Sequence, residues 1–165
     1  MLVRDAVLAD QPGILNIYND AVLHTTAVWN EAPRSEAEQQ QWFDAKQSQN
    51  LPVLVAHIDG EIAGFCSYGP FRPWYGYRFT VEGSIYVAQR YRRRGIATSL
   101  LNTLLQRARA QGMHAIVAGI EAENVASIRL HEQCGYRIAG CLHQVGYKFE
   151  RWLDLIFMEC ILDQQ

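Results

Sequence analysis

The chain lacks several features that would place it in a large class of proteins. Cysteine is scarce, with four in 165 residues, and no two of them form the Cys-x-x-Cys pair of zinc ribbons and thioredoxin-type sites. No apolar run approaches the roughly 18 residues that a membrane-spanning helix needs. The cysteines are Cys66, Cys134, Cys141 and Cys160. We expect reduced, structural thiols in a protein that binds no metal.

An excess of charge of one sign is also missing. The 15 lysines and arginines and the 17 aspartates and glutamates leave a net charge of −2. Proteins that bind nucleic acid generally are basic overall, so nucleic acid is not the expected partner. Met1-Leu2-Val3 runs directly into Arg4-Asp5, without a leader peptide, and we expect a cytoplasmic protein. The length and a hydrophobic content of 49% predict a single domain over residues 1–165.

The glycine-rich signatures of common nucleotide-binding loops are absent too. A Walker loop needs Gly-Lys-Ser or Gly-Lys-Thr, and a dinucleotide-binding loop needs three glycines in six residues. The chain has instead Arg90-Tyr91-Arg92-Arg93-Arg94-Gly95-Ile96-Ala97-Thr98 at the predicted start of a helix. The positive end of the helix dipole repels arginines at this position unless a bound anion offsets the repulsion. The small residues Gly95 and Ala97 would let the backbone N–H groups come close to a phosphate. A solvated, arginine-rich helix start is the alternative.

The helix after this loop is predicted by apolar residues at three- and four-residue spacing. They are Ile96, Leu100, Leu101, Leu104, Leu105 and Ala108, and Gly112 ends the run. Residues 79–87 before the loop predict a strand in which Gly83 indicates a bulge or the close approach of another backbone. Residues 115–120 predict a buried strand. Strand, helix and strand would then form a parallel crossover.

Two helices are predicted in the first third of the chain, after a strand over residues 2–6. Asp10 is expected to cap the first helix, which has Pro12 in its first turn. Ser35 and Glu38 form a capping box ahead of the second. The segment from His24 to Pro33 between the helices contains Thr25, Thr26 and Trp29, which either line a pocket or fill space between the helices.

A hairpin and an aromatic loop follow. Asp59-Gly60 lies between the apolar runs 52–58 and 62–68, which is typical of an antiparallel hairpin. The loop from Gly69 to Arg78 combines aromatic rings with two arginines. Aromatic rings and guanidinium groups together can form a binding pocket for a small zwitterion or carboxylate. Packing against a second subunit is the alternative use of this loop.

Glu82 is the candidate general base. A carboxylate inside a central strand is costly to bury unless it is hydrogen-bonded or has a function, and desolvation would raise its pKa. The alternative is an ion pair with a nearby arginine.

A second motif near residue 130 points to a family. The segment Asn124-Val125-Ala126-Ser127-Ile128-Arg129-Leu130-His131-Glu132-Gln133-Cys134-Gly135-Tyr136 resembles a signature of the GNAT superfamily of N-acetyltransferases. Arg92-x-x-Gly95-x-Ala97 resembles the pyrophosphate-binding signature of the same superfamily. The His131-Glu132 pair is not a zinc-protease motif, because Gly135 occupies the position of the second histidine.

Further stretches extend the resemblance over nearly the whole chain: residues 80–87, the aromatic loop before them, Gly146-Tyr147-Lys148-Phe149 and Arg151-Trp152-Leu153-Asp154. They resemble the branch that acetylates phosphinothricin and methionine sulfoximine or sulfone. The resemblance implies a mixed α/β fold, with a largely antiparallel sheet of about seven strands, splayed central strands near Gly83 and flanking helices. Residues 138–142 and 148–161 would be the last two strands. Acetyl-CoA is the implied cosubstrate.

The same resemblance, with the reasoning above, assigns the site. Coenzyme-binding residues would be Ile85, Tyr86, Val87, Arg92, Arg93, Arg94, Gly95, Ile96, Ala97, Thr98, Asn124 and Ser127. Substrate-binding residues would be Trp29, Arg72, Tyr75, Gly76, Tyr77, Arg78, Thr80 and Glu82, with Arg72 preferred to Arg78 as the carboxylate partner. His131 stands where many superfamily members have a tyrosine, so its role as the acid that protonates the thiolate is open.

The predicted function is acetyl transfer from acetyl-CoA to the α-amine of a small amino acid or analogue, with Glu82 as the general base. The predicted biological role is detoxification of such analogues. A homodimer is expected. Two alternatives remain: acetylation of a protein N-terminus or polyamine, and a non-catalytic module that binds acetyl-CoA or RNA. An aromatic loop with arginines favours the small-molecule acceptor over the first alternative, and the mild acidity argues against RNA.

Overall fold

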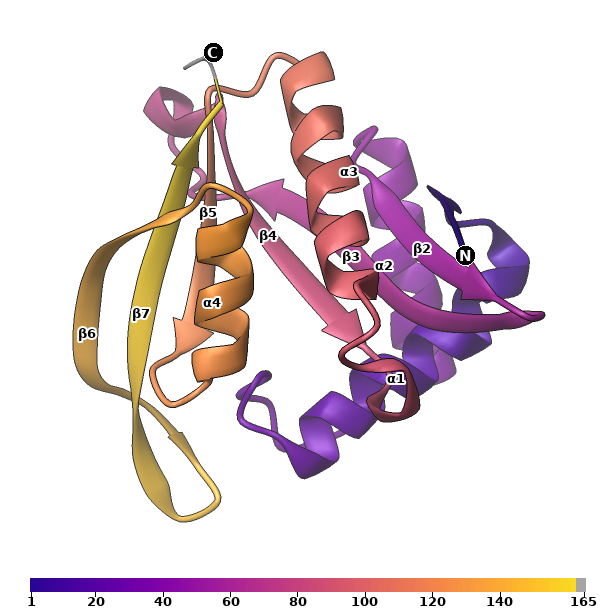
Figure 1. Cartoon of the computed structure of the whole chain (residues 1–165), viewed down its shortest axis with the longest axis horizontal. Coiled ribbons are helices and arrows are strands. Elements are labelled where there is room, and N and C mark those ends of the chain that lie inside the picture. Colours follow the sequence, from indigo (N-terminus) through magenta and orange to yellow (C-terminus); the bar gives the residue numbers. More distant parts are fainter. Residues whose placement is uncertain (163–165) are drawn as a thin grey trace.

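A seven-stranded sheet runs through the protein in the order β1-β2-β3-β4-β5-β7-β6 (Figure 1). The computed structural model describes residues 1–162, so residues 163–165 of the predicted domain lie outside it. The strands are β1 (Leu2–Asp5), β2 (Val53–Ile58), β3 (Glu61–Pro70), β4 (Thr80–Val87), β5 (Ala115–Glu121), β6 (Arg137–Lys148) and β7 (Arg151–Ile161). Only the pair of β4 and β5 is parallel among the pairs described. The predicted mixed, largely antiparallel sheet is confirmed.

Helix α3 (Ile96–Ala110) and helix α4 (Val125–Gln133) lie on one face of this sheet (Figure 1). The six apolar residues that predicted α3 are all buried, and they form the centre of the larger core cluster with β2 to β5 and β7. Because α3 connects β4 to the parallel strand β5, the predicted crossover is confirmed. No helix among residues 1–162 has both the length and the apolar composition to cross a membrane.

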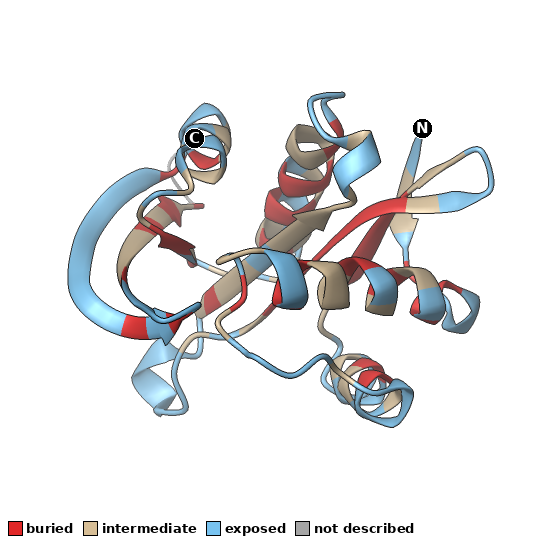
Figure 2. Cartoon of the chain, turned by 90° about the horizontal axis from the view of Figure 1, so that it is seen from below, coloured by how far each residue is buried: buried red, intermediate tan, exposed pale blue. Residues whose placement is uncertain are grey.

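Helices α1 (Gln11–His24) and α2 (Glu36–Ser48) cover the other face over β2 to β4. Figure 2 shows buried residues along the sides of the helices that meet the sheet. The capping box of α2 is confirmed: Ser35 Oγ accepts the Glu38 N–H at 3.2 Å, and Glu38 Oε2 accepts the Ser35 N–H at 2.7 Å. Asp59 and Gly60 both have positive φ, 49° and 89°, and form the predicted hairpin turn.

Two details of the predicted elements were wrong. Asp10 does not cap α1 with its side chain; its carboxylate accepts the Val7 N–H at 2.8 Å and two bonds from Arg4. The last hairpin is longer than predicted, because β6 continues to Lys148 and the turn is Phe149-Glu150, whose φ values are 50° and 58°. Lys148 therefore belongs to β6 and not to β7.

The two central strands separate after only three paired positions, the last of which is Glu82 with Val117 (Figure 1). The splay predicted near Gly83 is therefore present. The bulge or second backbone predicted at Gly83 is not, because β3 and β4 keep a continuous register there. A Cβ at Gly83 would instead lie 3.2 Å from Ile116 Cδ1. The separation leaves alternate backbone groups of β4 without a strand beside them and opens a cleft.

Candidate active site

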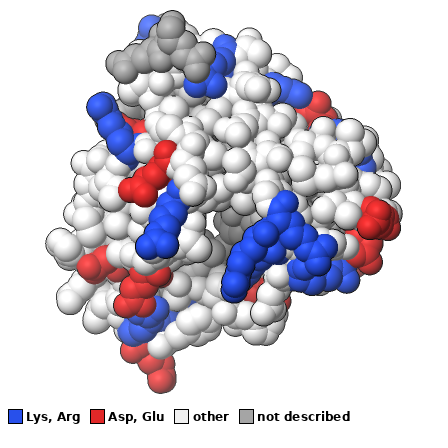
Figure 3. Space-filling model, in the orientation of Figure 1, with Lys and Arg blue, Asp and Glu red and all other residues white. Residues whose placement is uncertain are grey.

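A cleft of about 1050 Å³ opens where β4 and β5 separate. Its walls come from the end of α1, the end of β4 and the N-terminal turns of α3 and α4. Figure 3 shows a hollow with positively charged side chains beside it. All the predicted coenzyme-binding residues except Arg94 line the cleft: Ile85, Tyr86, Val87, Arg92, Arg93, Gly95, Ile96, Ala97, Thr98, Asn124 and Ser127.

The start of α3 is built to bind an anion. Its first helical hydrogen bond runs from Ser99 N to Gly95 O at 3.1 Å, so the N–H groups of Ile96, Ala97 and Thr98 precede the helical ladder and point outward. Gly95 makes this turn with φ +75°, a conformation that costs glycine little. The positive end of the helix dipole adds to the field of Arg92 and Arg93. These groups fit the pyrophosphate of a coenzyme.

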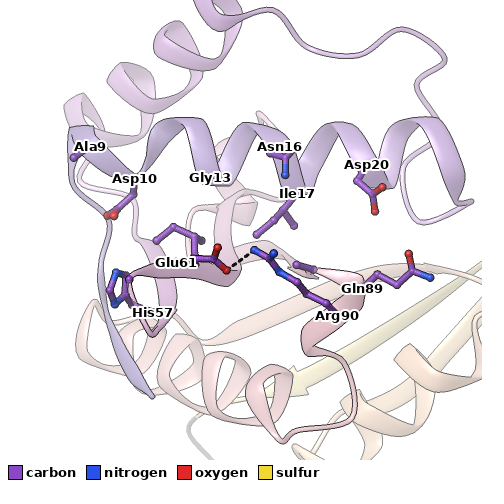
Figure 4. Close-up of a pocket in the computed structure, with 13 residues that line it drawn as sticks. Ala9, Asp10, Gly13, Asn16, Ile17, Asp20, His57, Glu61, Gln89 and Arg90 are labelled. Atoms are coloured by element: carbon purple, nitrogen blue, oxygen red, sulfur yellow. Dashed lines mark hydrogen bonds and ion pairs between the residues drawn. The ribbon is translucent and has the colours of Figure 1, made fainter.

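The other two arginines of the cluster are used differently. Arg90 Nη2 lies 2.5 Å from Glu61 Oε2, and Tyr91 donates to the same oxygen at 2.7 Å. Figure 4 shows this pair in a second cavity, of about 690 Å³, between α1 and the β2–β3 hairpin. Arg94 stacks on the Tyr91 ring, with its Cζ 5.6 Å from the ring centroid. Two of the four arginines therefore face the cleft.

The start of α4 forms the wall opposite α3. Asn124 is its N-cap, and its Oδ1 accepts the Ser127 N–H at 3.2 Å. This bond fixes the first turn of α4 and orients Asn124 and Ser127, both of which line the cleft.

Glu82 lies where the cleft closes, at the last paired position of β4 and β5. It does not line the open cleft itself, which begins three residues later at Ile85. Its Oε1 would lie 3.3 Å from a Cβ at Gly119, so the carboxylate leans onto β5 where no side chain occupies the space. Burial raises the pKa of Glu82, and the charge of Arg72 opposes that rise. A raised pKa at a cleft is the property expected of a general base.

Arg72 and Arg78 of the aromatic loop have different surroundings. The Arg72 guanidinium lies over the Phe71 ring, with its Cζ 4.1 Å from the ring centroid. Its positive charge lowers the pKa of the Glu82 carboxylate. Arg78 stacks on Tyr75 at 4.2 Å and donates to the Tyr75 carbonyl at 3.2 Å. Arg72 also donates to its own loop, from Nη1 to the Phe71 carbonyl at 2.8 Å. It differs from Arg78 because its charge lowers the pKa of the predicted base.

The remaining predicted substrate residues lie on three different segments of the chain. Tyr75, Gly76 and Tyr77 form a short 3-10 turn and are exposed, with Tyr75 78% exposed. Thr80 is half-buried at the start of β4, paired with Ala115. The Trp29 ring lies against Gly146 of β6. Of these five, none lines the cleft that holds the coenzyme-binding residues.

His131 lies in the last turn of α4 and is buried, with 4% of its surface exposed. Its Nδ1–H donates to the Ser127 carbonyl at 2.8 Å, and its ring meets the Tyr136 ring edge-on at 4.8 Å. Burial lowers the pKa of His131, so the ring is neutral near pH 7 and its other nitrogen accepts rather than donates a proton. This placement gives little support to the predicted role as an acid.

Sequence reasoning missed two buried charged residues as site residues: Glu121, which lines the cleft, and Lys148, which contacts the cleft residue Thr25; they are 5% and 1% exposed. Glu121 offered the same signal as Glu82, a carboxylate at the end of an apolar strand. Lys148 offered only its place in the stretch Gly146-Tyr147-Lys148-Phe149, which resembles the branch, because a lysine at a strand end is usually solvated.

The thiols are free, as expected, although Cys141 is exposed rather than packed in the core. Outside the cleft, Cys141, His143 and Asp154 bring three potential metal-ligand atoms within 4.8 Å of one another on exposed parts of β6 and β7. Absence of a metal requirement stays a prediction.

The comparisons with known proteins agree with this geometry. Residues 14–136 match the model of the acetyltransferase (GNAT) family. The chain is 54% identical to an L-methionine sulfoximine/L-methionine sulfone acetyltransferase from Pseudomonas aeruginosa, over 98% of this chain and 94% of the relative. It is 34% identical to a phosphinothricin N-acetyltransferase from Streptomyces viridochromogenes, over 95% and 85%.

Two solved structures show the same fold. A Salmonella typhimurium putative acetyltransferase with its cofactor acetyl-CoA has a TM-score of 0.96 at 43% identity, over 99% of this chain and 95% of that one. A ribosomal-protein-alanine N-acetyltransferase from Brucella melitensis has a TM-score of 0.97 at 48% identity, over 98% and 100%. The cleft, its anion-binding helix start and these matches together show that the chain is an acetyltransferase and belongs to the GNAT family.

Proposed function

We propose that this acetyltransferase moves an acetyl group from acetyl-CoA to the α-amine of a small amino acid or analogue, of the methionine sulfoximine, methionine sulfone or phosphinothricin type. The observation that carries the proposal is the position of Glu82. Burial raises the pKa of this carboxylate, the charge of Arg72 opposes the rise, and Glu82 is the last paired position before β4 and β5 separate. The names of the Pseudomonas and Streptomyces relatives support the acceptor class.

The residues of this chain divide the work of the reaction. The N–H groups of Ile96 to Thr98, with Arg92 and Arg93, hold the pyrophosphate, so that acetyl-CoA supplies an activated thioester at the closed end of the cleft. Glu82 removes a proton from the acceptor ammonium, directly or through water, and leaves a neutral amine as the nucleophile. Backbone N–H groups near Val87 stabilise the oxyanion. The one N–H of neutral His131 donates to the Ser127 carbonyl, so in this proposal the leaving thiolate takes its proton from water and His131 orients the first turns of α4.

The proposal includes the setting of the enzyme. The protein would be a single-domain cytoplasmic homodimer that detoxifies amino-acid analogues and needs no metal. Exposed aromatic side chains support the dimer: Trp74 is 66% exposed and Trp152 is 61% exposed, and large exposed apolar surfaces usually mark contacts.

A second candidate function is acetylation of a protein N-terminus, which the name of the Brucella structure favours. Release of free thiol from acetyl-CoA, measured with a panel of amino acids, their analogues and peptides that begin with alanine, separates the two. Turnover of peptides but not of free amino acids would overturn the proposal. Thermal stabilisation by acetyl-CoA without turnover of any amine would indicate a binding module.

Replacing Arg72 by alanine is expected to raise the KM for a free amino acid about ten- to a hundredfold, because a charge-assisted hydrogen bond contributes about 1.5–3 kcal/mol. The KM for acetyl-CoA should change little. The acid limb of the pH profile should also move to higher pH, because Arg72 lowers the pKa of Glu82 and its removal lets that pKa rise. Initial rates across pH, with acceptor and coenzyme varied in turn, measure these effects.

Arg78→Ala is the matched control, because Arg78 belongs to the same loop and also stacks on an aromatic ring. An acceptor whose carboxylate is amidated should be insensitive to Arg72→Ala. If acid and amide lose activity equally, Arg72 supports the loop structure, and the loop belongs to a subunit interface.

A further inference from the structure

A buried lysine lies behind the cleft wall at Thr25, and no step of the proposed reaction uses it. Lys148, the last residue of β6, is 1% exposed. Its ammonium group donates to three backbone carbonyls, those of Val22 at 2.5 Å, Thr25 at 2.8 Å and Val28 at 2.5 Å. Three donors thus meet three acceptors, which is the full capacity of an ammonium group and allows its burial.

The Val22 carbonyl belongs to the end of α1, and the other two belong to the segment that follows it. We name residues Thr25–Trp29 the α1 exit segment. The Val22 carbonyl lies in the last turn of α1, where a helix leaves carbonyls unpaired and carries the negative end of its dipole. A cation is favoured there. The exit segment folds around the ammonium group, and without that group three carbonyls would be left in a buried site.

Two further contacts hold the same segment. Thr26 Oγ1 donates to Glu121 Oε2 at 3.0 Å, and the other Glu121 oxygen accepts the Glu123 N–H at 3.0 Å. The Trp29 ring covers Gly146 so closely that a methyl group on Gly146 would overlap it. The α1 exit segment is therefore attached to β5 once and to β6 twice.

These attachments cross the gap in the sheet. Helix α1 packs on β2 to β4, whereas Glu121, Gly146 and Lys148 belong to the half formed by β5, β7 and β6. Beyond Glu82 and Val117 no backbone pairing joins the two halves in the described chain. Figure 1 shows the end of α1 reaching the β5 side of this gap. Thr25 and Thr26 also line the cleft, facing the starts of α3 and α4.

We propose that Lys148 is a positioning residue that joins the two halves of the splayed sheet through the α1 exit segment, and so sets the width of the cleft between that segment and the starts of α3 and α4. Glu121 assists through Thr26. The inference rests on the proposed function for its effect on catalysis, whereas its structural part stands without any substrate. Misplacement of reacting groups by about 1 Å can cost roughly a hundredfold in rate.

The test compares Lys148→Met with Lys46→Met. Methionine keeps the length of the side chain and removes its donors. Lys46 is a matched control, because it is half-buried and its Nζ also donates to a carbonyl, that of Tyr68 at 2.6 Å, but on α2 and away from the cleft. Amide hydrogen exchange of residues 25–29 should become faster in Lys148→Met and stay unchanged in Lys46→Met. The acceptor kcat/KM should fall about a hundredfold only in Lys148→Met, with acetyl-CoA affinity within a few fold.

A second pair of variants keeps the proposal testable if Lys148→Met does not fold. Gly146→Ala should displace Trp29, and Thr26→Val should remove the bond to Glu121; both should speed exchange of residues 25–29. Their losses in acceptor kcat/KM should be less than additive when combined, because both act through one segment. Unchanged exchange, or additive losses, would overturn the inference. A wild-type enzyme inactive on every amine refutes the proposed function, and the exchange result still decides the role of Lys148.

Discussion

Replacing Glu82 by glutamine is expected to lower kcat by about a hundred- to ten-thousandfold, the range typical of a lost general base. Affinity for acetyl-CoA should change little, because Glu82 is not among the residues that line the cleft with the predicted pyrophosphate-binding groups. The loss should shrink at high pH, where the acceptor amine is already neutral. Initial rates across pH, with direct titration of acetyl-CoA binding, measure both effects.

The same substitution should change the pH dependence of stability in a defined direction. The pKa of Glu82 in the folded protein lies above its ordinary value of 4.5. Over that interval the native state keeps a proton that the unfolded chain has lost, so the free energy of unfolding falls as pH rises through it. Glu82→Gln should therefore be more stable than wild type at neutral pH and about equal to it well below pH 4.5. A pH-independent loss of activity, with no gain in stability, would indicate positioning instead of proton removal.

Replacing Gly95 by valine is expected to abolish measurable binding of acetyl-CoA while the fold survives. A Cβ at Gly95 meets no protein atom within 4 Å, so the obstacle is not packing inside the protein. A β-branched residue at a φ of +75° would carry at least about 1–2 kcal/mol of backbone strain. A change of φ that relieves this strain would move the N–H groups of Ile96, Ala97 and Thr98. The new methyl groups would also block the approach of a phosphate.

Gly112→Val is the matched control, because Gly112 lies beyond the other end of α3 with φ +74° and an equally open surrounding. Both variants should lose similar unfolding free energy in denaturant titrations. Only Gly95→Val should lose coenzyme binding by calorimetry. Near-normal affinity in a folded Gly95→Val protein would remove the pyrophosphate assignment.

Local patterns in the sequence predicted the elements that depend on neighbouring residues. The periodicity of α3, the capping box at Ser35, the Asp59-Gly60 turn and the two motifs around Gly95 and Asn124 are complete within a few residues of chain. Each of them is confirmed as structure because a helix, a cap or a tight turn is specified by short-range hydrogen bonding and spacing.

The features decided only by the tertiary structure join residues far apart in the chain. Lys148 meets the Val22 carbonyl across 126 positions, and Thr26 meets Glu121 across 95. Whether a lysine is solvated or caged, and whether His131 is an exposed acid or a buried neutral ring, depends on which distant segments cover it. The sequence by itself determined the family and the local elements that begin at Gly95 and Asn124. The contacts of Lys148, Glu121 and His131 were decided by packing between distant segments, which leaves no local pattern.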